Sequence, residues 1–201
     1  MRLIRRPQAA QRGFYLIEVM VAVMLTSVAL LGLLALQSRS IAYSHDSQQR
    51  QNALLLAADL ARSIQANRTA LVSKGKLSAD AAYLVPAGSS FPSLGSGQSC
   101  ATSGLGKADR ARRELACWVE QVRLKLNTDD ALLSENTFIC PSRDGKTCDG
   151  ASRQPLLLIQ LAWHSRNCQA GSPTTADDDD AACLSGSDAG GVERYRLSFQ
   201  P

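Results

Sequence analysis

Polar and apolar residues divide the beginning of the chain into two contrasting stretches. Residues 1–13 are basic and polar, and residues 14–36 form an apolar run of 23 residues that carries a single charge, Glu18. An α-helix of that length rises roughly 34 Å, about the thickness of the hydrocarbon core of a bilayer. The pattern therefore predicts a membrane-spanning helix preceded by a short basic leader.

The helical pattern continues beyond residue 36 with a polar side. Apolar residues recur at intervals of three and four, namely Ala53, Leu56, Leu60 and Ile64. No proline occurs from Phe14 to Val85. We therefore expect one helix from about Phe14 to about Asn67. The alternative is two helices separated near Ser38–Ser47, where serine and histidine interrupt the apolar pattern.

The second half of the chain predicts a shorter helix followed by strands. A Gly-, Ser- and Pro-rich connection over residues 86–106 leads to a helical pattern at Lys107–Leu126, whose apolar face comprises Ala111, Leu115, Trp118, Val119 and Val122. We expect strands at Thr137–Cys140, Pro155–Trp163 and Val192–Phe199, and we interpret residues 165–191 as a polar excursion. This order predicts an α+β fold in which a long N-terminal helix packs on a C-terminal antiparallel sheet.

Charge is concentrated in the leader. Its four arginines belong to 22 basic residues in all, so the remainder has 18 basic and 18 acidic residues and is formally neutral. This balance gives no support to a nucleic-acid partner. Aromatic residues are only 5% of the 201 residues, which argues against a large aromatic pocket for a small-molecule substrate.

Six cysteines lie in the second half of the chain: Cys100, Cys117, Cys140, Cys148, Cys168 and Cys183. An even number is typical of disulfides formed in an oxidising compartment, and the short C-x₂₋₄-C pair typical of zinc sites is missing. Six cysteines permit 15 pairings, among which the sequence does not choose. Local closure favours Cys140 with Cys148 and Cys168 with Cys183, which leaves Cys100 with Cys117.

The apolar segment itself permits more than one interpretation. A secretory signal would have an apolar core of roughly 7–15 residues and a small-residue cleavage site after it, and neither is present. A plain signal anchor accounts for the length and for the basic leader, which orients residues 1–13 toward the cytoplasm. It does not account for Glu18, because a carboxylate near the bilayer interior costs on the order of 2.5 kcal/mol or more.

The residues around this glutamate resemble a known signature. Arg12-Gly13-Phe14-Tyr15-Leu16-Ile17-Glu18-Val19 is similar to the start of type IV prepilins, with a glycine, an aromatic residue and a Leu-Ile-Glu run. The resemblance implies that a prepilin peptidase cleaves between Gly13 and Phe14 and N-methylates Phe14. It further implies that Glu18 pairs with the amine of Phe14 on a neighbouring subunit.

Later blocks of the chain resemble PilV-type minor pilins, the type IV pilus modification proteins. These blocks are LLGLLALQSRS, DLARSIQANRTA, ACWVEQVRLKL and LLLIQLAWHSR. The resemblance implies a leader at 1–13, a transmembrane and filament-core helix at 14–36, its continuation at 37–67 and a periplasmic head at 68–201. It implies a location in the bacterial inner membrane and then in the pilus, with other minor pilins and the major pilin as partners.

The sequence offers no convincing catalytic or metal site. We interpret His45 and His164 as surface residues, because neither has a nucleophile or carboxylate partner that sequence spacing can identify. Asp177–Asp180 lacks the spaced ligands and glycine turn of a calcium loop. We therefore expect a structural protein without cofactor or metal. A minor pseudopilin of type II secretion and a signal-anchored periplasmic enzyme remain as alternatives.

Overall fold

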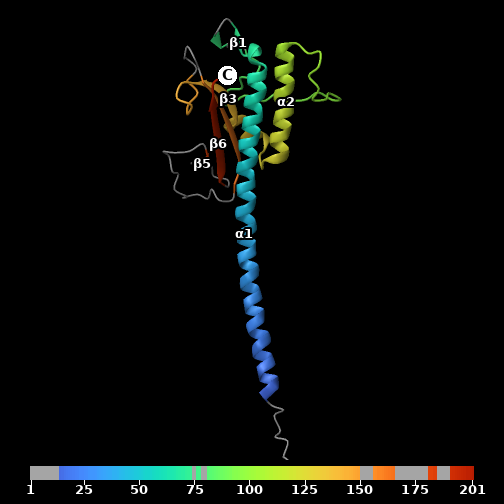
Figure 1. Ribbon diagram of the computed structural model, residues 1–201, viewed down its shortest axis with the longest axis vertical. Coiled ribbons are helices and arrows are strands. Elements are labelled where there is room, and N and C mark those ends of the chain that lie inside the picture. Colours follow the sequence, from blue (N-terminus) through green and yellow to red (C-terminus); the bar gives the residue numbers. More distant parts are fainter. Residues whose placement is uncertain (1–13, 74–75, 78–80, 150–155, 166–180, 185–190) are drawn as a thin grey trace, which may run out of the picture. The chain divides into compact units, whose positions relative to one another are not determined.

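Helix α1 runs unbroken from Phe14 to Ala66 in the computed structural model of the chain (Figure 1). The structure describes residues 14–73, 76–77, 81–149, 156–165, 181–184 and 191–201. Since no proline occurs in α1, no helical hydrogen-bond donor is lost along it. The helix continues through Ser38–Ser47, so the alternative of two separate helices is wrong.

The remaining elements form a head in which a short two-stranded hairpin precedes two helices and the other strands. They are η1 (Arg68–Ala70), β1 (Val72–Ser73), β2 (Lys76–Leu77), α2 (Lys107–Lys125), α3 (Asp130–Asn136), β3 (Phe138–Ser142), β4 (Leu156–His164), β5 (Ala181–Leu184) and β6 (Val192–Phe199). A long N-terminal helix thus precedes a C-terminal sheet, and the predicted α+β class is confirmed.

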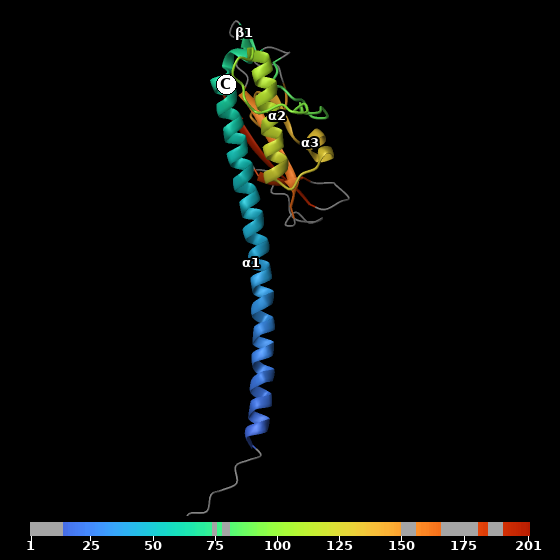
Figure 2. The ribbon, with the colours of Figure 1, turned by 90° about the vertical axis from the view of Figure 1, so that its right-hand side faces the viewer.

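The larger sheet is antiparallel throughout, with the strand order β3-β4-β6-β5. Its longest pairing joins β4 to β6, from Leu157 opposite Phe199 to His164 opposite Val192. Figure 2 shows the strands behind α2 and beside the second half of α1. Strands β1 and β2 form a separate two-stranded hairpin.

The core lies between the helices and one face of the sheet. Alternate residues of β4 point to this face and are fully buried, namely Leu157, Ile159, Leu161 and Trp163. The predicted apolar faces of the two helices meet them, with Leu60 and Ile64 from α1 and Leu115 and Val119 from α2. On the opposite face of the sheet, Leu132 of α3 packs with Ala162 and Val192. Both faces of β4 are therefore covered, which explains its nearly continuous apolar sequence.

The chain divides into two compact units between Ser44 and His45. The second unit contains the end of α1 together with α2, α3 and the sheets. Residues His45–Ala66 therefore belong to the same unit as the strands they pack on.

Three short features differ from the sequence-based expectations. Helix α3 and the β1–β2 hairpin were not expected, and β5 lies inside the stretch 165–191 that we interpreted as a polar excursion. Each has seven residues or fewer. Elements of this length depend on contacts with the rest of the fold more than on their own propensity.

Candidate membrane and assembly segment

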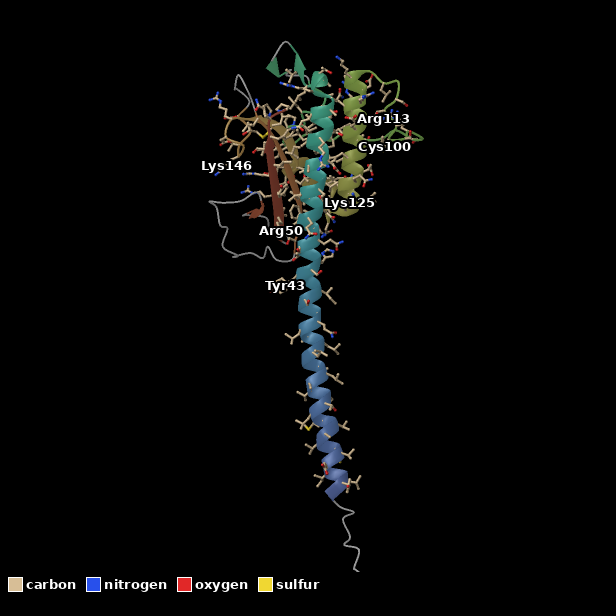
Figure 3. All side chains as sticks on the ribbon, viewed as in Figure 1. Tyr43, Arg50, Cys100, Arg113, Lys125 and Lys146 are labelled. Atoms are coloured by element: carbon tan, nitrogen blue, oxygen red, sulfur yellow. A yellow bond between two sulfur atoms is a disulfide. The ribbon has the colours of Figure 1, made fainter. Side chains whose placement is uncertain are left out.

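The first half of α1 is apolar and exposed. Every side chain from Tyr15 to Leu36 is exposed, and an 18-residue window of the helix has a mean hydropathy of 2.6 with none of it buried. Figure 3 shows the side chains of this half projecting from the ribbon on all sides. Apolar surface exposed to water is unfavourable by about 25 cal/mol per Å². By length and composition α1 can cross a membrane, and among the described residues it is the one helix that can.

Glu18 is the single charge in this apolar half. It is the fifth residue of α1, its side chain is exposed, and it forms no ion pair with any residue that the structure describes. Phe14 is the first residue of the helix, whereas Gly13 lies outside the described residues. A carboxylate in apolar surroundings is stabilised by a cation close by. Among the described residues none supplies such a cation to Glu18.

The aliphatic hydroxyl groups in this half, those of Thr26 and Ser27, are satisfied within the helix. Thr26 Oγ1 donates to the carbonyl oxygens of Ala22 and Val23, at 2.9 and 3.0 Å. Ser27 Oγ donates to the carbonyl oxygen of Met24 at 2.8 Å. Such bonds remove the need for water at these groups. The two hydroxyl residues are therefore compatible with an apolar environment.

The second half of α1 is fixed in the head by core packing and one buried polar contact. Ala53, Ala57 and Ile64 are fully buried. The indole Nε1 of Trp118, on α2, donates to the main-chain carbonyl oxygen of Leu56 at 2.8 Å. Small residues at 53 and 57 let the neighbouring elements approach α1 closely, and the indole bond fixes the position of α2 along it.

The helical turn before Ala53 is held by polar contacts. The main-chain N–H of Asn127 donates to Gln49 Oε1 at 3.1 Å, and Asn52 Nδ2 donates to the carbonyl oxygen of Lys125 at 3.3 Å. Arg50 Nε donates to Glu193 Oε1 on β6, where Glu193 is only 2% exposed. The start of the head is therefore bound to α1 by hydrogen bonds and an ion pair, in contrast to the apolar core beyond it.

Two disulfides close loops of the head. Cys100 is joined to Cys117 of α2, and Cys140 of β3 is joined to Cys148. These are two of the three pairings that local closure favoured. For the third, Cys168 lies outside the described residues, and only the main chain of Cys183 is described, in β5.

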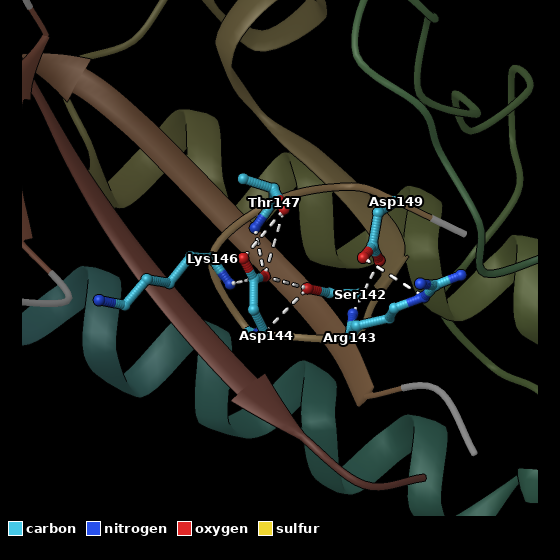
Figure 4. A network of polar contacts seen from close by, with 7 residues as sticks. Ser142, Arg143, Asp144, Lys146, Thr147 and Asp149 are labelled. Carbon is cyan, nitrogen blue, oxygen red and sulfur yellow. Dashed lines mark hydrogen bonds and ion pairs between the residues drawn. The ribbon is translucent and has the colours of Figure 1, made fainter. Parts of the chain in front are cut away.

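The loop closed by Cys140 and Cys148 is organised around Asp144 (Figure 4). Its carboxylate accepts hydrogen bonds from the main-chain amides of Lys146 and Thr147 and from the hydroxyl of Ser142, at 2.7 to 3.0 Å. These bonds, the amide bonds above all, hold the pKa of Asp144 well below its usual range. Gly145 has a φ of 71°, and a side chain there would lie 2.8 Å from Ser198 Oγ. The turn at Asp144-Gly145 thus needs glycine for two reasons.

The two histidines of the head lie in different polar settings. His164 Nε2 lies 3.1 Å from Asp129 Oδ2, a carboxylate that sequence spacing did not identify, and Asp129 also caps α3. His45 lines an open groove with polar neighbours, Gln48, Gln49, Asn52 and Lys125. Within the described residues no three His, Cys, Asp or Glu side chains gather as metal ligands. The run Asp177–Asp180, which lacks the spacing of a calcium loop, lies outside the described residues.

Comparisons with known proteins return nothing. The chain matches no protein-family model, no curated protein and no solved structure. The interpretation of its function therefore depends on its own residues and geometry.

Proposed function

We propose that this chain is a membrane-anchored subunit of a type IV pilus, a minor pilin of the PilV type that functions in assembly and not in catalysis. The observation that carries the proposal is the apolar, exposed half of α1 with one carboxylate, Glu18, in its second turn. A plain anchor has no use for this charge. A subunit that packs its helix against identical or similar helices does, because a neighbour can supply the missing cation.

The cation that fits this role is a main-chain amine at Phe14. Cleavage between Gly13 and Phe14 by a prepilin peptidase would create it at the first residue of α1, and N-methylation would follow. The amine of one subunit and Glu18 of the next would then neutralise each other among apolar helices. Such a pair fixes the axial register of neighbouring subunits, since every other displacement leaves a carboxylate unpaired.

The head supports an extracytoplasmic location. Two disulfides close loops of this small domain, and disulfides persist in oxidising compartments such as the bacterial periplasm. The basic leader would remain on the cytoplasmic side of the inner membrane. The partners would be the prepilin peptidase first, and then other minor pilins and the major pilin.

A deletion strain tests the proposal, scored for surface pili and for extracellular enzyme secretion in the same cultures. Loss of pili with secretion intact is the expected result. Loss of secretion with intact pili would identify a minor pseudopilin of a type II secretion system and contradict the pilus assignment. Full activity of both systems would contradict the assembly role altogether.

A further inference from the structure

Two arginines lie side by side on the face of the sheet opposite the main core. Arg194 and Arg196 belong to β6, which lies between β4 and β5 inside the sheet. Residues two apart on a strand point to the same face and are spaced by about 7 Å. Both side chains are half-exposed. In the part of the chain that the structure describes, neither forms an ion pair.

The guanidinium of Arg196 is oriented by a neutral partner. Its Nε donates to Gln160 Oε1 at 2.7 Å, and Gln160 Nε2 donates in turn to the carbonyl oxygen of Asn136 at 2.8 Å. Gln160 is only 3% exposed, so its orientation is fixed by packing as well. Since Nε is occupied, the two terminal nitrogens remain for another acceptor, and among the described residues they have none.

The electrostatics of this pair are unfavourable without an anion. Burial, followed by the charge of Arg194, lowers the pKa of Arg196, and the charge of Asp144 opposes this with a smaller effect. The carboxylate of Asp144 is already occupied by hydrogen bonds from its own loop. Arg62 and Arg123 of the head each have an acidic partner within 4.0 Å. Arg110 and Arg113 are also half-exposed and, like this pair, form no ion pair with a described residue.

We propose that Arg194 and Arg196 bind a compact dianion, a phosphate or a dicarboxylate. A fixed guanidinium presents parallel N–H donors that match the oxygens of such groups, and a second guanidinium beside it neutralises the second charge. The site lies in the head and does not involve Glu18, so it is independent of the proposed role of α1.

The test is thermal unfolding of the full chain in a non-ionic, phosphate-free detergent. Inorganic phosphate and succinate are titrated separately, at constant ionic strength maintained with chloride. We expect both ions, or one of them, to raise the melting temperature of the wild type by mass action. Arg194→Gln and Arg196→Gln each weaken the apparent affinity by about tenfold or more, as expected for a lost charge-assisted hydrogen bond. Arg62→Gln is the matched control and leaves the affinity unchanged.

Two further variants make the result unambiguous. Arg196→Lys keeps the charge but lacks the planar fork, so weaker binding by this variant supports the proposal even where Arg196→Gln fails to fold. The second is the fourfold variant Asp177→Asn, Asp178→Asn, Asp179→Asn and Asp180→Asn. If phosphate and succinate bind only to this variant, the arginines of the wild type pair with the chain's own carboxylates, and the proposal is overturned. Equal losses of apparent affinity in Arg62→Gln and Arg196→Gln would also overturn it. So would a wild-type melting temperature that neither ion raises.

Discussion

Trp118 of α2 donates the N–H of its indole ring to the main-chain carbonyl oxygen of Leu56, in the middle of the buried half of α1. The distance is 2.8 Å and the contact is buried. The indole ring also packs against Phe91, with 5.9 Å between ring centroids. One side chain thus joins α1, α2 and the connection before α2.

Replacing Trp118 by phenylalanine removes the hydrogen bond while keeping an aromatic ring. We expect Trp118→Phe to lower the free energy of unfolding by about 1 kcal/mol plus a smaller packing loss, because the Leu56 carbonyl remains in its helical hydrogen bond. Trp118→Ala adds a cavity and costs about 3–5 kcal/mol. Chemical denaturation measures both. Equal losses for the two variants would show that the hydrogen bond, and not the packing, dominates this contact.

Glu193 shows why a buried charge needs its partner. It is 2% exposed and receives a hydrogen bond from Arg50, whose side chain is 55% exposed. We expect Arg50→Leu to destabilise the head by about 2 kcal/mol, because it leaves a carboxylate buried without a cation while water screens part of the original pair. The double variant Arg50→Leu with Glu193→Leu should recover much of this loss. A double-mutant cycle measures the coupling.

Arg62→Leu is the matched control for this cycle. Arg62 also lies on α1 and pairs with Asp59, but both side chains are well exposed. Loss of the Arg62 guanidinium should change the free energy of unfolding by no more than about 0.5 kcal/mol. A comparable loss in Arg62→Leu and Arg50→Leu would contradict the importance of burial at Glu193.

The long elements and the core could be predicted from the sequence. The helices α1 and α2 and the strands β4 and β6 each present a periodic apolar pattern that extends over several turns or residues. The predicted face of α2 is buried in full, from Ala111 to Val122. Local pattern and tertiary packing agree in these elements, which is why their positions were predictable.

The polar contacts of the head could not be predicted in the same way. Glu193 has the same parity in β6 as Tyr195, Leu197 and Phe199, so it places a charge on the apolar face of the strand, where it pairs with Arg50 and is buried. Its partner lies 143 residues away in sequence, and no local pattern reports such a distance. For α3 a signal was present, because Asp129 precedes Asp130 and an apolar pair as an N-cap precedes a helix. For Glu18, Gly13 and the proposed partners, the structure provides no test and the assignment stays a prediction.

The cap of α3 makes the stability of the head depend on pH. Asp129 accepts a hydrogen bond from the main-chain amide of Leu132, and this bond, with a smaller effect of His164, lowers the pKa of Asp129 below its ordinary value. A depressed folded-state pKa contributes stability above the unfolded pKa of about 4, and this contribution is lost as the pH falls through the folded value. Asp129→Ala should cost about 1 kcal/mol at neutral pH.

Unfolding experiments between about pH 3 and pH 7 measure both effects of this substitution. In the wild type, the free energy of unfolding should decline below about pH 4. In Asp129→Ala this decline should be smaller, because the titrating carboxylate is missing. Asp59→Ala, at an exposed site on α1, serves as the control and should leave the decline as it is. An equally large decline in Asp129→Ala and in the wild type would contradict the contribution of the cap.

The two disulfides should differ in their contribution to the free energy of unfolding. In the chain-entropy model, the Cys100–Cys117 link, with a separation of 17 residues, contributes about 3 kcal/mol, and the Cys140–Cys148 link, with a separation of 8, contributes about 2.5 kcal/mol. The paired serine variants measure these values by denaturation. The loop around Asp144 keeps its hydrogen bonds without the shorter link, so Cys140→Ser with Cys148→Ser should show the milder loss. The reverse order would indicate that the Asp144 contacts depend on this disulfide.

The carboxylate of Glu18 gives the most specific prediction of the proposed function. Glu18→Ala removes a group that costs on the order of 2.5 kcal/mol or more in the bilayer, so the variant should insert into the membrane at least as well as the wild type. It should nevertheless be absent from sheared pili, because the amine of a neighbouring Phe14 then lacks its partner. Glu18→Gln should fail in the same way, since it keeps the size and loses the charge. Ser27→Ala, which loses only a bond within its own helix, is the control.

Immunoblots of membrane and sheared fractions compare the variants. Normal incorporation of Glu18→Ala would contradict the pairing with Phe14, whereas its loss from the membrane would show that Glu18 is needed before assembly begins.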